Sequence, residues 1–443
     1  MKKLIETLKN IYKIEDLRSR IGVTLFLLLI YRLGSFVVLP GVDPQQLFEL
    51  QAKASDGLLG LLNMFSGGAF SKASVFGLGI MPYISASIVI QLLGIAVPYF
   101  QRLQKEGESG RRKINQITRI LTVVILIAQA PAYLSLIDSK AIMINASLFK
   151  IIAMVVLTAG SMFVMWLGER ITDKGIGNGI SLIIMIGIIA RLPQAIIGEF
   201  ISRFEEGGGL VMFLVEFVVM FVVFMVTILL VQGTRRIPVQ YAKRIVGNRQ
   251  FGGVRQYIPL KVNAAGVMPI IFAQAIMFVP ITLAGFASGS ESMSAFAAAF
   301  ADITGFWYNF VTFVLVIVFT YFYTAITVNP TMMAEDMKKN GGFIPGVKPG
   351  KKTVEFLDAV MSRITFPGSI FLGLVTILPS FAMLAGVTQS FAYFFGGTSL
   401  LILVGVVLDT LQQVESHLLM RHYDGLMKSG RIKGRTGGGA AVM

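Results

Sequence analysis

Long apolar segments alternate with shorter polar and charged segments along this chain. A helix needs about 20 apolar residues to cross a bilayer. Ten segments are long enough, and they lie near 21–39, 75–97, 117–137, 151–168, 180–198, 210–231, 265–286, 308–328, 366–385 and 395–414. The fifth is the weakest because Arg191 and Pro193 interrupt it. The pattern predicts an all-α membrane protein of ten spans, with both termini on the same side of the bilayer.

A shorter apolar segment precedes the second span. Residues 57–65 are apolar and end at Ser66, Gly67 and Gly68, and the full-length span begins at about residue 75. The short piece cannot cross a bilayer, and irregular backbone at membrane depth needs protein or a water-filled cavity around it. We therefore expect a short helix that enters the membrane and turns on glycines, an arrangement that suits a pore.

The composition and the basic residues support a membrane protein and orient it. Hydrophobic residues make up 55% of the chain and charged residues 14%, against about 25% charged in a typical soluble domain. If both termini and the four loops 98–116, 169–179, 232–264 and 329–365 share one face, that face carries most of the 39 Lys and Arg residues. The opposite face has six, which are Lys53, Lys72, Lys140, Lys150, Arg191 and Arg203. The positive-inside rule makes the basic face cytoplasmic, and the first apolar run lacks a small-residue cleavage site, so we interpret it as a retained span.

Two cytoplasmic loops are strongly basic. Residues 232–264 contain seven Lys and Arg residues and no acid, and residues 329–365 contain six Lys and Arg residues among several glycines and prolines. One interpretation is that the loops only fix the topology and touch anionic lipid. The other is a docking surface for an acidic or polyanionic partner such as ribosomal RNA.

The residues needed by most enzymes are missing from the spans. The two histidines, His417 and His422, lie at or beyond the end of the last span, and Asp409 is the only aspartate inside a span. The chain has no cysteine, so a disulfide, an iron–sulfur cluster and a thiolate metal site are excluded. We expect no enzymatic activity, no metal and no cofactor. A secondary transporter remains the alternative, although its usual ionisable groups at membrane depth are reduced here to Arg32, Glu216 and Asp409.

Several motifs resemble the SecY family, the channel subunits of the bacterial protein translocase, and the resemblance runs almost end to end. They are RLGSF (32–36), NMFSGGA (63–69), GIMPYISASI (79–88), EGESGRRKI (106–114), MWLGE (165–169), GIGNGIS (175–181), YAKR (241–244), PLKVN (259–263), FYTA (322–325) and FGGTSLLI (395–402). The resemblance implies a channel in the bacterial plasma membrane that passes unfolded secretory polypeptides and releases membrane helices sideways into lipid. It also implies two inverted five-span halves around a pore. We expect a cytoplasmic N-terminus at 1–20, the halves at 21–198 and 199–414, and a cytoplasmic tail at 415–443.

The resemblance implies a ring of six apolar side chains at the narrowest point of the pore. By motif match they are Ile80, Ile84, Ile180, Ile184, Ile271 and Ile402. Spacing alone would not assign this role, although a hydrophobic constriction is a physically sensible seal against ions. The short helix at 57–70 would be a plug that swings away when a substrate enters, and the alternative is an inert re-entrant segment. Its candidate residues are Leu58, Leu61, Leu62, Met64, Phe65, Gly67 and Gly68.

The resemblance further implies a lateral gate and several partners. The gate would open between the second and third spans on one side and the seventh and eighth on the other, with Ser85, Ser87, Gln91 and Gln274 as candidates. The small subunits SecE and SecG would accompany the chain, and signal sequences and nascent polypeptides would enter it. The ribosome and the motor ATPase SecA would dock on Arg235, Arg236, Lys243, Arg244, Arg249, Arg255, Lys348, Lys351 and Lys352. Lys348 stands where the family usually has arginine, which keeps the charge but loses the bidentate fork.

Overall fold

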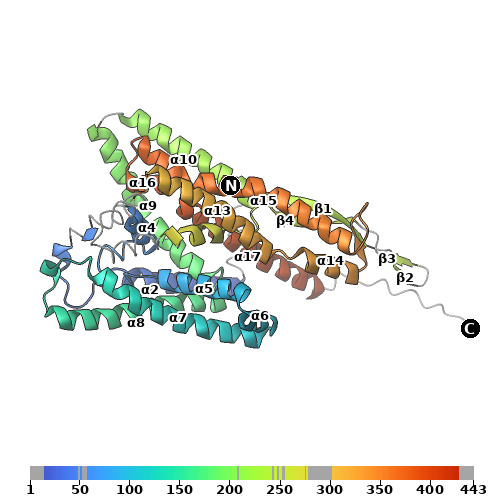
Figure 1. The fold of residues 1–443 in the computed structure, drawn as a ribbon, viewed down its shortest axis with the longest axis horizontal. Helices are drawn as coiled ribbons and strands as arrows, with labels where there is room; N and C mark the ends of the chain where they lie inside the picture. The colour runs from blue at the N-terminus through green and yellow to red at the C-terminus, as the bar shows by residue number, and fades with distance from the viewer. Residues whose placement is uncertain are drawn as a thin grey trace, which may run out of the picture.

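The computed structural model shows a helical protein with two small sheets (Figure 1). It describes residues 14–47, 50–51, 57–206, 209–241, 244–246, 249–251, 255–274, 276–277 and 302–428. Its long helices are α2 (Glu15–Gly34), α5 (Met81–Ala96), α7 (Glu108–Leu134), α8 (Ala146–Lys174), α9 (Gly179–Glu206), α10 (Gly209–Gln232), α13 (Phe306–Thr327), α15 (Lys351–Leu384) and α17 (Gly397–Lys428). The shorter helices are α4 (Gly57–Phe65), α6 (Pro98–Lys105), α14 (Pro330–Lys339) and α16 (Gln389–Ala392), with 3-10 turns η1 (Pro44–Gln46) and η2 (Ser139–Ala141).

Nine of the ten predicted spans coincide with a long helix. Seven helices of the described residues are long and apolar enough to cross a membrane, or eight if α5 and α6, bent by 99° at Val97, count as one span. The helix α2 has 20 residues but carries three arginines, Arg18, Arg20 and Arg32. The predicted seventh span is helical over 268–274, and its part beyond 277 lies outside the described residues. The all-α fold class is confirmed.

The helices form two groups joined by α9. Figure 1 shows α2, α5, α7 and α8 in one group and α10, α13, α15 and α17 in the other. The helix α9 packs against α2 and α8 of the first group and against α10 and α17 of the second. The short helix α4 also packs against α9.

The two basic loops fold together into one small domain. Strand β1 (Thr234–Tyr241) pairs antiparallel with β4 (Arg255–Lys261) and with β5 (Gly342–Phe343), and β2 (Arg244–Val246) with β3 (Arg249–Phe251) forms a separate hairpin. Side chains alternate along β1, so Ile237 and Val239 are buried while the arginines before them are exposed. These two residues pack with Leu260, Ala334, Met337, Ile344, Leu357 and Met361. Much of the second basic loop is therefore helix rather than loop, because α14 and the start of α15 cover this sheet.

Candidate functional site

Five of the six isoleucines assigned to the pore ring lie in one apolar cluster. Ile80 at the start of α5, Ile184 on α9 and Ile402 on α17 are buried in it, and Ile84 and Ile180 pack against it. The cluster also contains Met64 and Phe65 of the short helix α4. Residues from α4, α5, α9 and α17, which are far apart in the sequence, therefore belong to one continuous apolar core that includes residues of both groups of helices.

The sixth isoleucine, Ile271, lies outside this cluster. It is half-buried on the described helical turn 268–274. Its neighbour Ile270 is fully buried in a different core, where it packs with Val316, Leu372, Leu400 and other residues of the second group. One cluster thus unites five of the six candidates, and Ile271 is not part of it.

Asn178 caps the start of α9, the helix that carries Ile180 and Ile184. Asn178 precedes α9, and its side-chain Oδ1 accepts hydrogen bonds from the backbone N–H groups of Ile180 and Ser181, at 3.1 and 3.3 Å. An asparagine in this position satisfies N–H groups that have no partner within the helix. It fixes the first turn of α9, so Ile180 and, one turn later, Ile184 lie on the same face.

The segment after α4 forms a closed, hydrogen-bonded turn. The Asn63 side-chain Oδ1 accepts from the Ser71 N–H at 3.1 Å, and Ser66 Oγ accepts from the Phe70 N–H at 3.1 Å. Gly67 and Gly68 have φ angles of +65° and +87°, a region that side chains rarely adopt. Leu62 packs against a second core, and the side chains of Leu58 and Leu61 lie outside the described residues. The glycines are therefore required by the turn itself, whatever movement it makes.

The turn lies directly against α9 and α2. A Cβ atom added at Gly187 of α9 would be 2.6 Å from the Phe65 carbonyl oxygen and 3.1 Å from the Gly67 nitrogen, so only glycine permits this approach. From α2, Arg32 Nη1 donates a hydrogen bond of 2.7 Å to the Gly67 carbonyl oxygen. Tyr31 Oη donates to the Ser66 carbonyl oxygen at 3.4 Å. Arg32, a charge near the centre of the first predicted span, thus bonds to the backbone of the turn.

Three cations surround this turn. Arg32 and Lys72 both lie over the ring of Phe36, at 4.9 and 3.8 Å from its centroid. Arg191 of α9 lies beside Gly68, because its Nε would be 4.0 Å from a Cβ atom added there. Contact with an aromatic face stabilises a cation that is short of water. The turn after α4 therefore lies in a positive electrostatic environment.

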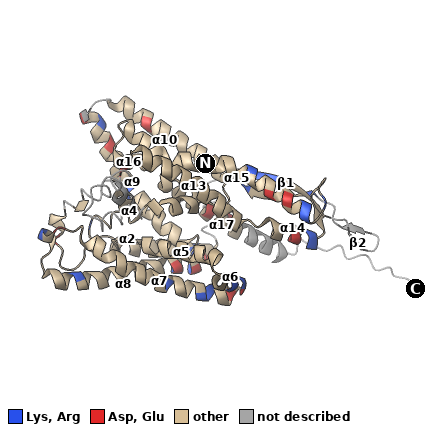
Figure 2. Ribbon diagram, viewed as in Figure 1, with Lys and Arg blue, Asp and Glu red and all other residues tan. Residues whose placement is uncertain are grey.

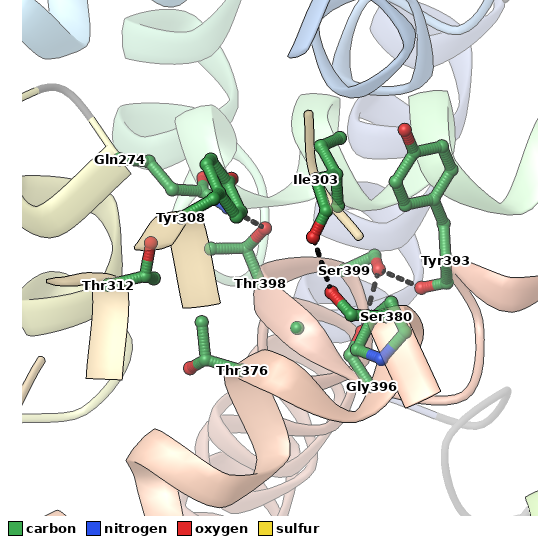
Figure 3. A pocket seen from close by; sticks show the side chains of 12 residues that line it. Gln274, Ile303, Tyr308, Thr312, Thr376, Ser380, Tyr393, Gly396, Thr398 and Ser399 are labelled. Atoms are coloured by element: carbon green, nitrogen blue, oxygen red, sulfur yellow. Dashed lines mark hydrogen bonds between the residues drawn. The ribbon is translucent and has the colours of Figure 1, made fainter. Parts of the chain in front are cut away.

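The gate candidates do not contact one another across the two groups. On α5, Gln91 Nε2 donates to Ser87 Oγ at 3.4 Å, and Ser85 Oγ donates to its own helix at Met81. Gln274 Nε2 instead donates to Thr398 Oγ1 at 3.1 Å, within the second group. Figure 3 shows this bond at the edge of a small polar pocket whose hydroxyl groups come from α13, α15 and α17.

A larger cavity separates the second span from the seventh and eighth. It has a volume of about 220 Å³. Gln91 and Leu92 of α5 line one side and Phe272 and Tyr323 the other. The helices are thus not fully packed at the place where the resemblance puts the lateral gate.

The basic docking candidates gather at the end of the molecule formed by the sheet. Figure 2 shows Lys and Arg around β1 and the adjoining ends of α14 and α15. Arg235, Arg236 and Arg255 are exposed on β1 and β4, and Lys348 and Lys351 are exposed at the start of α15. Lys243 and the side chains of Arg244 and Arg249 lie outside the described residues.

One docking candidate, Lys352, already has an acidic partner. Its Nζ lies 2.8 Å from Glu355 Oε2, and this hydrogen bond and the charge of Glu355 raise the pKa of Lys352. Its positive charge is partly neutralised within the chain. It therefore offers less to an anionic partner than Lys348 and Lys351, which form no ion pair among the described residues.

Sequence reasoning missed two residues of this site. Gly187 permits the contact between α9 and the turn after α4, and Thr398 accepts the hydrogen bond from Gln274. A glycine inside an apolar helix commonly marks a close backbone approach, so Gly187 did carry a signal. The role of Thr398 had none, because its partner is 124 residues away.

Comparisons with known proteins agree with the geometry. The sequence model of the SecY family matches residues 74–411. The protein translocase subunit SecY of Streptomyces scabiei is 43% identical over 94% of this chain and 98% of its own length. The same subunit of Mycobacterium tuberculosis is 42% identical over 93% and 97%.

Solved structures show the same fold. A protein-conducting channel superposes with a TM-score of 0.58 at 16% identity, covering 90% of this chain and 92% of that chain. Sec61 in a canine ribosome–channel complex from the endoplasmic reticulum gives a TM-score of 0.54 at 16% identity, with the same coverage of both chains.

Proposed function

The chain belongs to the SecY family, and from this premise we propose which of its residues form the pore, the plug, the gate and the docking surface. It is a protein-conducting channel that passes unfolded polypeptides across a membrane and releases membrane helices into lipid. Membership in this family favours the channel over a secondary transporter. Both termini and the basic sheet face the cytoplasm of the bacterial plasma membrane, as the distribution of Lys and Arg supports.

The pore ring is formed by Ile80, Ile84, Ile180, Ile184 and Ile402, with Ile271 as a sixth member from the seventh span. The observation that carries this assignment is the single apolar cluster that joins the first five to Met64 and Phe65 of α4. A ring of aliphatic side chains can close around a moving chain and resists wetting when the chain is absent. The helix α4 and the turn 66–71 act as the plug on the outer side of this ring.

The lateral gate opens between α5 and α7, which are the second and third spans, on one side and the seventh and eighth spans on the other. The cavity lined by Gln91 and Tyr323 supports this position, because helices that leave about 220 Å³ between them separate at a lower cost than closely packed ones. Ser85, Ser87 and Gln274 make their hydrogen bonds within their own group of helices, so opening breaks none of the bonds seen at these residues.

The basic sheet docks the ribosome and SecA, and SecE and SecG complete the channel in the membrane. The pairing of β1 with β5 supports this proposal, because it unites the two basic loops into one surface. Such a surface attracts RNA phosphates or acidic side chains without requiring a fixed sequence in the partner.

Site-specific crosslinking tests the pore assignment. A photoreactive residue at Ile84 should crosslink to a stalled secretory nascent chain in membranes, and only when its signal sequence is intact. The matched control is Val222, which is 52% exposed on the outer face of α10 and should not crosslink to the same chain. If Ile84 gives no crosslink while the basic sheet does, docking is supported and the pore assignment is wrong.

A further inference from the structure

Two buried glutamates share one arginine where α9 meets α10, at the end of the molecule opposite the basic sheet (Figure 2). Arg203 Nε donates to Glu199 Oε1 at 2.9 Å, and its Nη2 contacts Glu216 Oε1 and donates to the Gly386 carbonyl oxygen at 2.8 Å. Glu199 is 0% exposed and Glu216 is 4% exposed. The cluster therefore holds two potential negative charges and one positive charge away from water.

The two carboxyl groups have unequal surroundings. Glu199 Oε2 accepts a hydrogen bond of 2.8 Å from the Thr388 N–H and a second one from the Thr388 hydroxyl, while Oε1 accepts from Arg203. An ionised Glu199 is thus fully paired. Glu216 contacts Arg203, but its Oε2 has no hydrogen-bond donor among the described residues. Both carboxyl groups meet at the same guanidinium group, that of Arg203.

Two buried carboxyl groups that share one arginine favour the binding of one proton. Ionised carboxylates have only acceptor sites, so two of them cannot hydrogen-bond to each other, and two neighbouring carboxyl groups in a poorly solvated site hold one proton between them. An uncompensated buried charge costs several kcal/mol, and the surroundings of α10 are protein and lipid. One proton removes the excess negative charge and supplies the missing donor.

No other charge among the described residues acts on Glu216. The charged groups beside Glu216 are Glu199 and Arg203, both on α9. The turn before α16 contributes only the neutral Thr388 and the Gly386 carbonyl oxygen. The helix α17 also packs against α10, but its first ionisable side chain is Asp409, about 18 Å along the helix from its start at a rise of about 1.5 Å per residue.

We propose that Glu216 is a proton-binding site: it is protonated and neutral in this structure, and its O–H donates to the ionised Glu199 carboxylate. The proton joins the first helix of the second group to α9, which contacts both groups. Loss of the proton places two negative charges in contact and loosens α10 from α9. This inference does not depend on the pore, plug or docking assignments.

Infrared spectroscopy of the full-length chain in lipid tests the protonation directly. A protonated carboxylic acid has a C=O stretching band that is separate from the carboxylate bands. We expect such a band at neutral pH, where a free glutamate, with a pKa of about 4.3, is ionised. The band should be lost in Glu216→Gln. If the acid region of the spectrum is the same in the wild type and Glu216→Gln, the proposal is wrong.

Thermal unfolding of the same full-length protein provides a second, independent measurement. Glu216→Gln should keep the wild-type unfolding temperature, because the amide oxygen can accept from Arg203 and the amide N–H can donate to Glu199. The matched variant Glu199→Gln should unfold at a lower temperature, because its amide group cannot accept all three hydrogen bonds that Glu199 accepts. An equal loss in both variants would mean that both glutamates are ionised, which contradicts the proposal.

The pH dependence of the free energy of unfolding provides a third test of the bound proton. Above about pH 4.3 the unfolded chain has released the Glu216 proton and the folded chain still holds it, so the free energy of unfolding falls as the pH rises. We expect this slope in the wild type and a smaller slope in Glu216→Gln. Equal slopes would show that Glu216 takes up no proton on folding.

Discussion

Arg32 and Gly67 are joined by a hydrogen bond of 2.7 Å from the guanidinium Nη1 to the carbonyl oxygen. The bond connects α2 to the turn that follows α4, at a glycine with a left-handed φ of +65°. Arg32 has no ion pair among the described residues, and its side chain also lies against the ring of Phe36. Because this segment is the proposed plug, we expect the bond from Arg32 to stabilise its closed position and to break when the plug moves.

Replacing Arg32 should therefore favour the open plug. A hydrogen bond to a charged group contributes about 1.5–3 kcal/mol, which corresponds to roughly a tenfold to hundredfold shift of the closed–open equilibrium toward open. Arg32→Met should raise the ion conductance of the channel in planar bilayers without a substrate. Arg20→Met is the matched control, because Arg20 lies on the same helix and pairs only with Asp16 at the surface. An unchanged conductance in Arg32→Met would show that the bond does not hold the plug.

A methyl group at Gly187 should have a similar effect by a different mechanism. The added Cβ would lie 2.6 Å from the Phe65 carbonyl oxygen, which is backbone and cannot rotate away. Such overpacking costs typically about 1–3 kcal/mol, and the turn after α4 can relieve it by moving outward. Gly187→Ala should increase substrate-free conductance, whereas Gly198→Ala on the same helix, where nothing lies within 4 Å, should not. Equal conductance in the two variants would show that the contact between α9 and the turn does not hold the plug closed.

The apolar pattern predicted the helices well because each membrane-spanning helix satisfies its backbone hydrogen bonds within itself. Length and hydropathy then decide, as they do for α8 and α10. The interruption of the fifth segment by Arg191 and Pro193 did not break α9, which continues to Glu206. Proline is tolerated there because it lies in a helix whose neighbours provide the packing.

The pattern predicted the contacts between elements poorly, because these depend on tertiary packing. The pairing of Gln240 with Phe343 joins two loops about a hundred residues apart, and neither loop signals the other in its sequence. Arg32 was recognisable as an unusual charge in a span, but its partner is a backbone carbonyl, which has no sequence signature. The sequence therefore identifies Arg32 and the two basic loops as unusual, but it does not identify what each of them contacts.

Charge reversal on the docking surface should weaken ribosome binding most at cations that have no acidic neighbour within the chain. Arg236→Glu on β1 should weaken ribosome binding to the membrane-embedded channel and reduce its dependence on salt, since each lost phosphate contact lowers the salt slope by roughly one. Lys352→Glu should have a smaller effect, because Glu355 lies 2.8 Å from the Lys352 Nζ and already neutralises part of its charge. Lys140→Glu is the control, because Lys140 belongs to the face predicted to lie opposite the basic loops. If all three variants bind equally, the sheet is not the docking surface.

Polar substitutions should separate the members of the pore ring. Ile402 is buried in the cluster that contains Met64 and Phe65 of the plug, whereas Ile271 lies outside it. An asparagine in a hydrophobic constriction attracts water, so Ile402→Asn should make the resting channel conduct ions. Ile271→Asn should conduct less, because the closed plug seals against the other five side chains. The ion conductance of the two variants is compared in planar bilayers. Val222→Asn, on the outer face of α10, is the control. Greater conductance in Ile271→Asn than in Ile402→Asn would place the seal nearer the seventh span than the apolar cluster indicates.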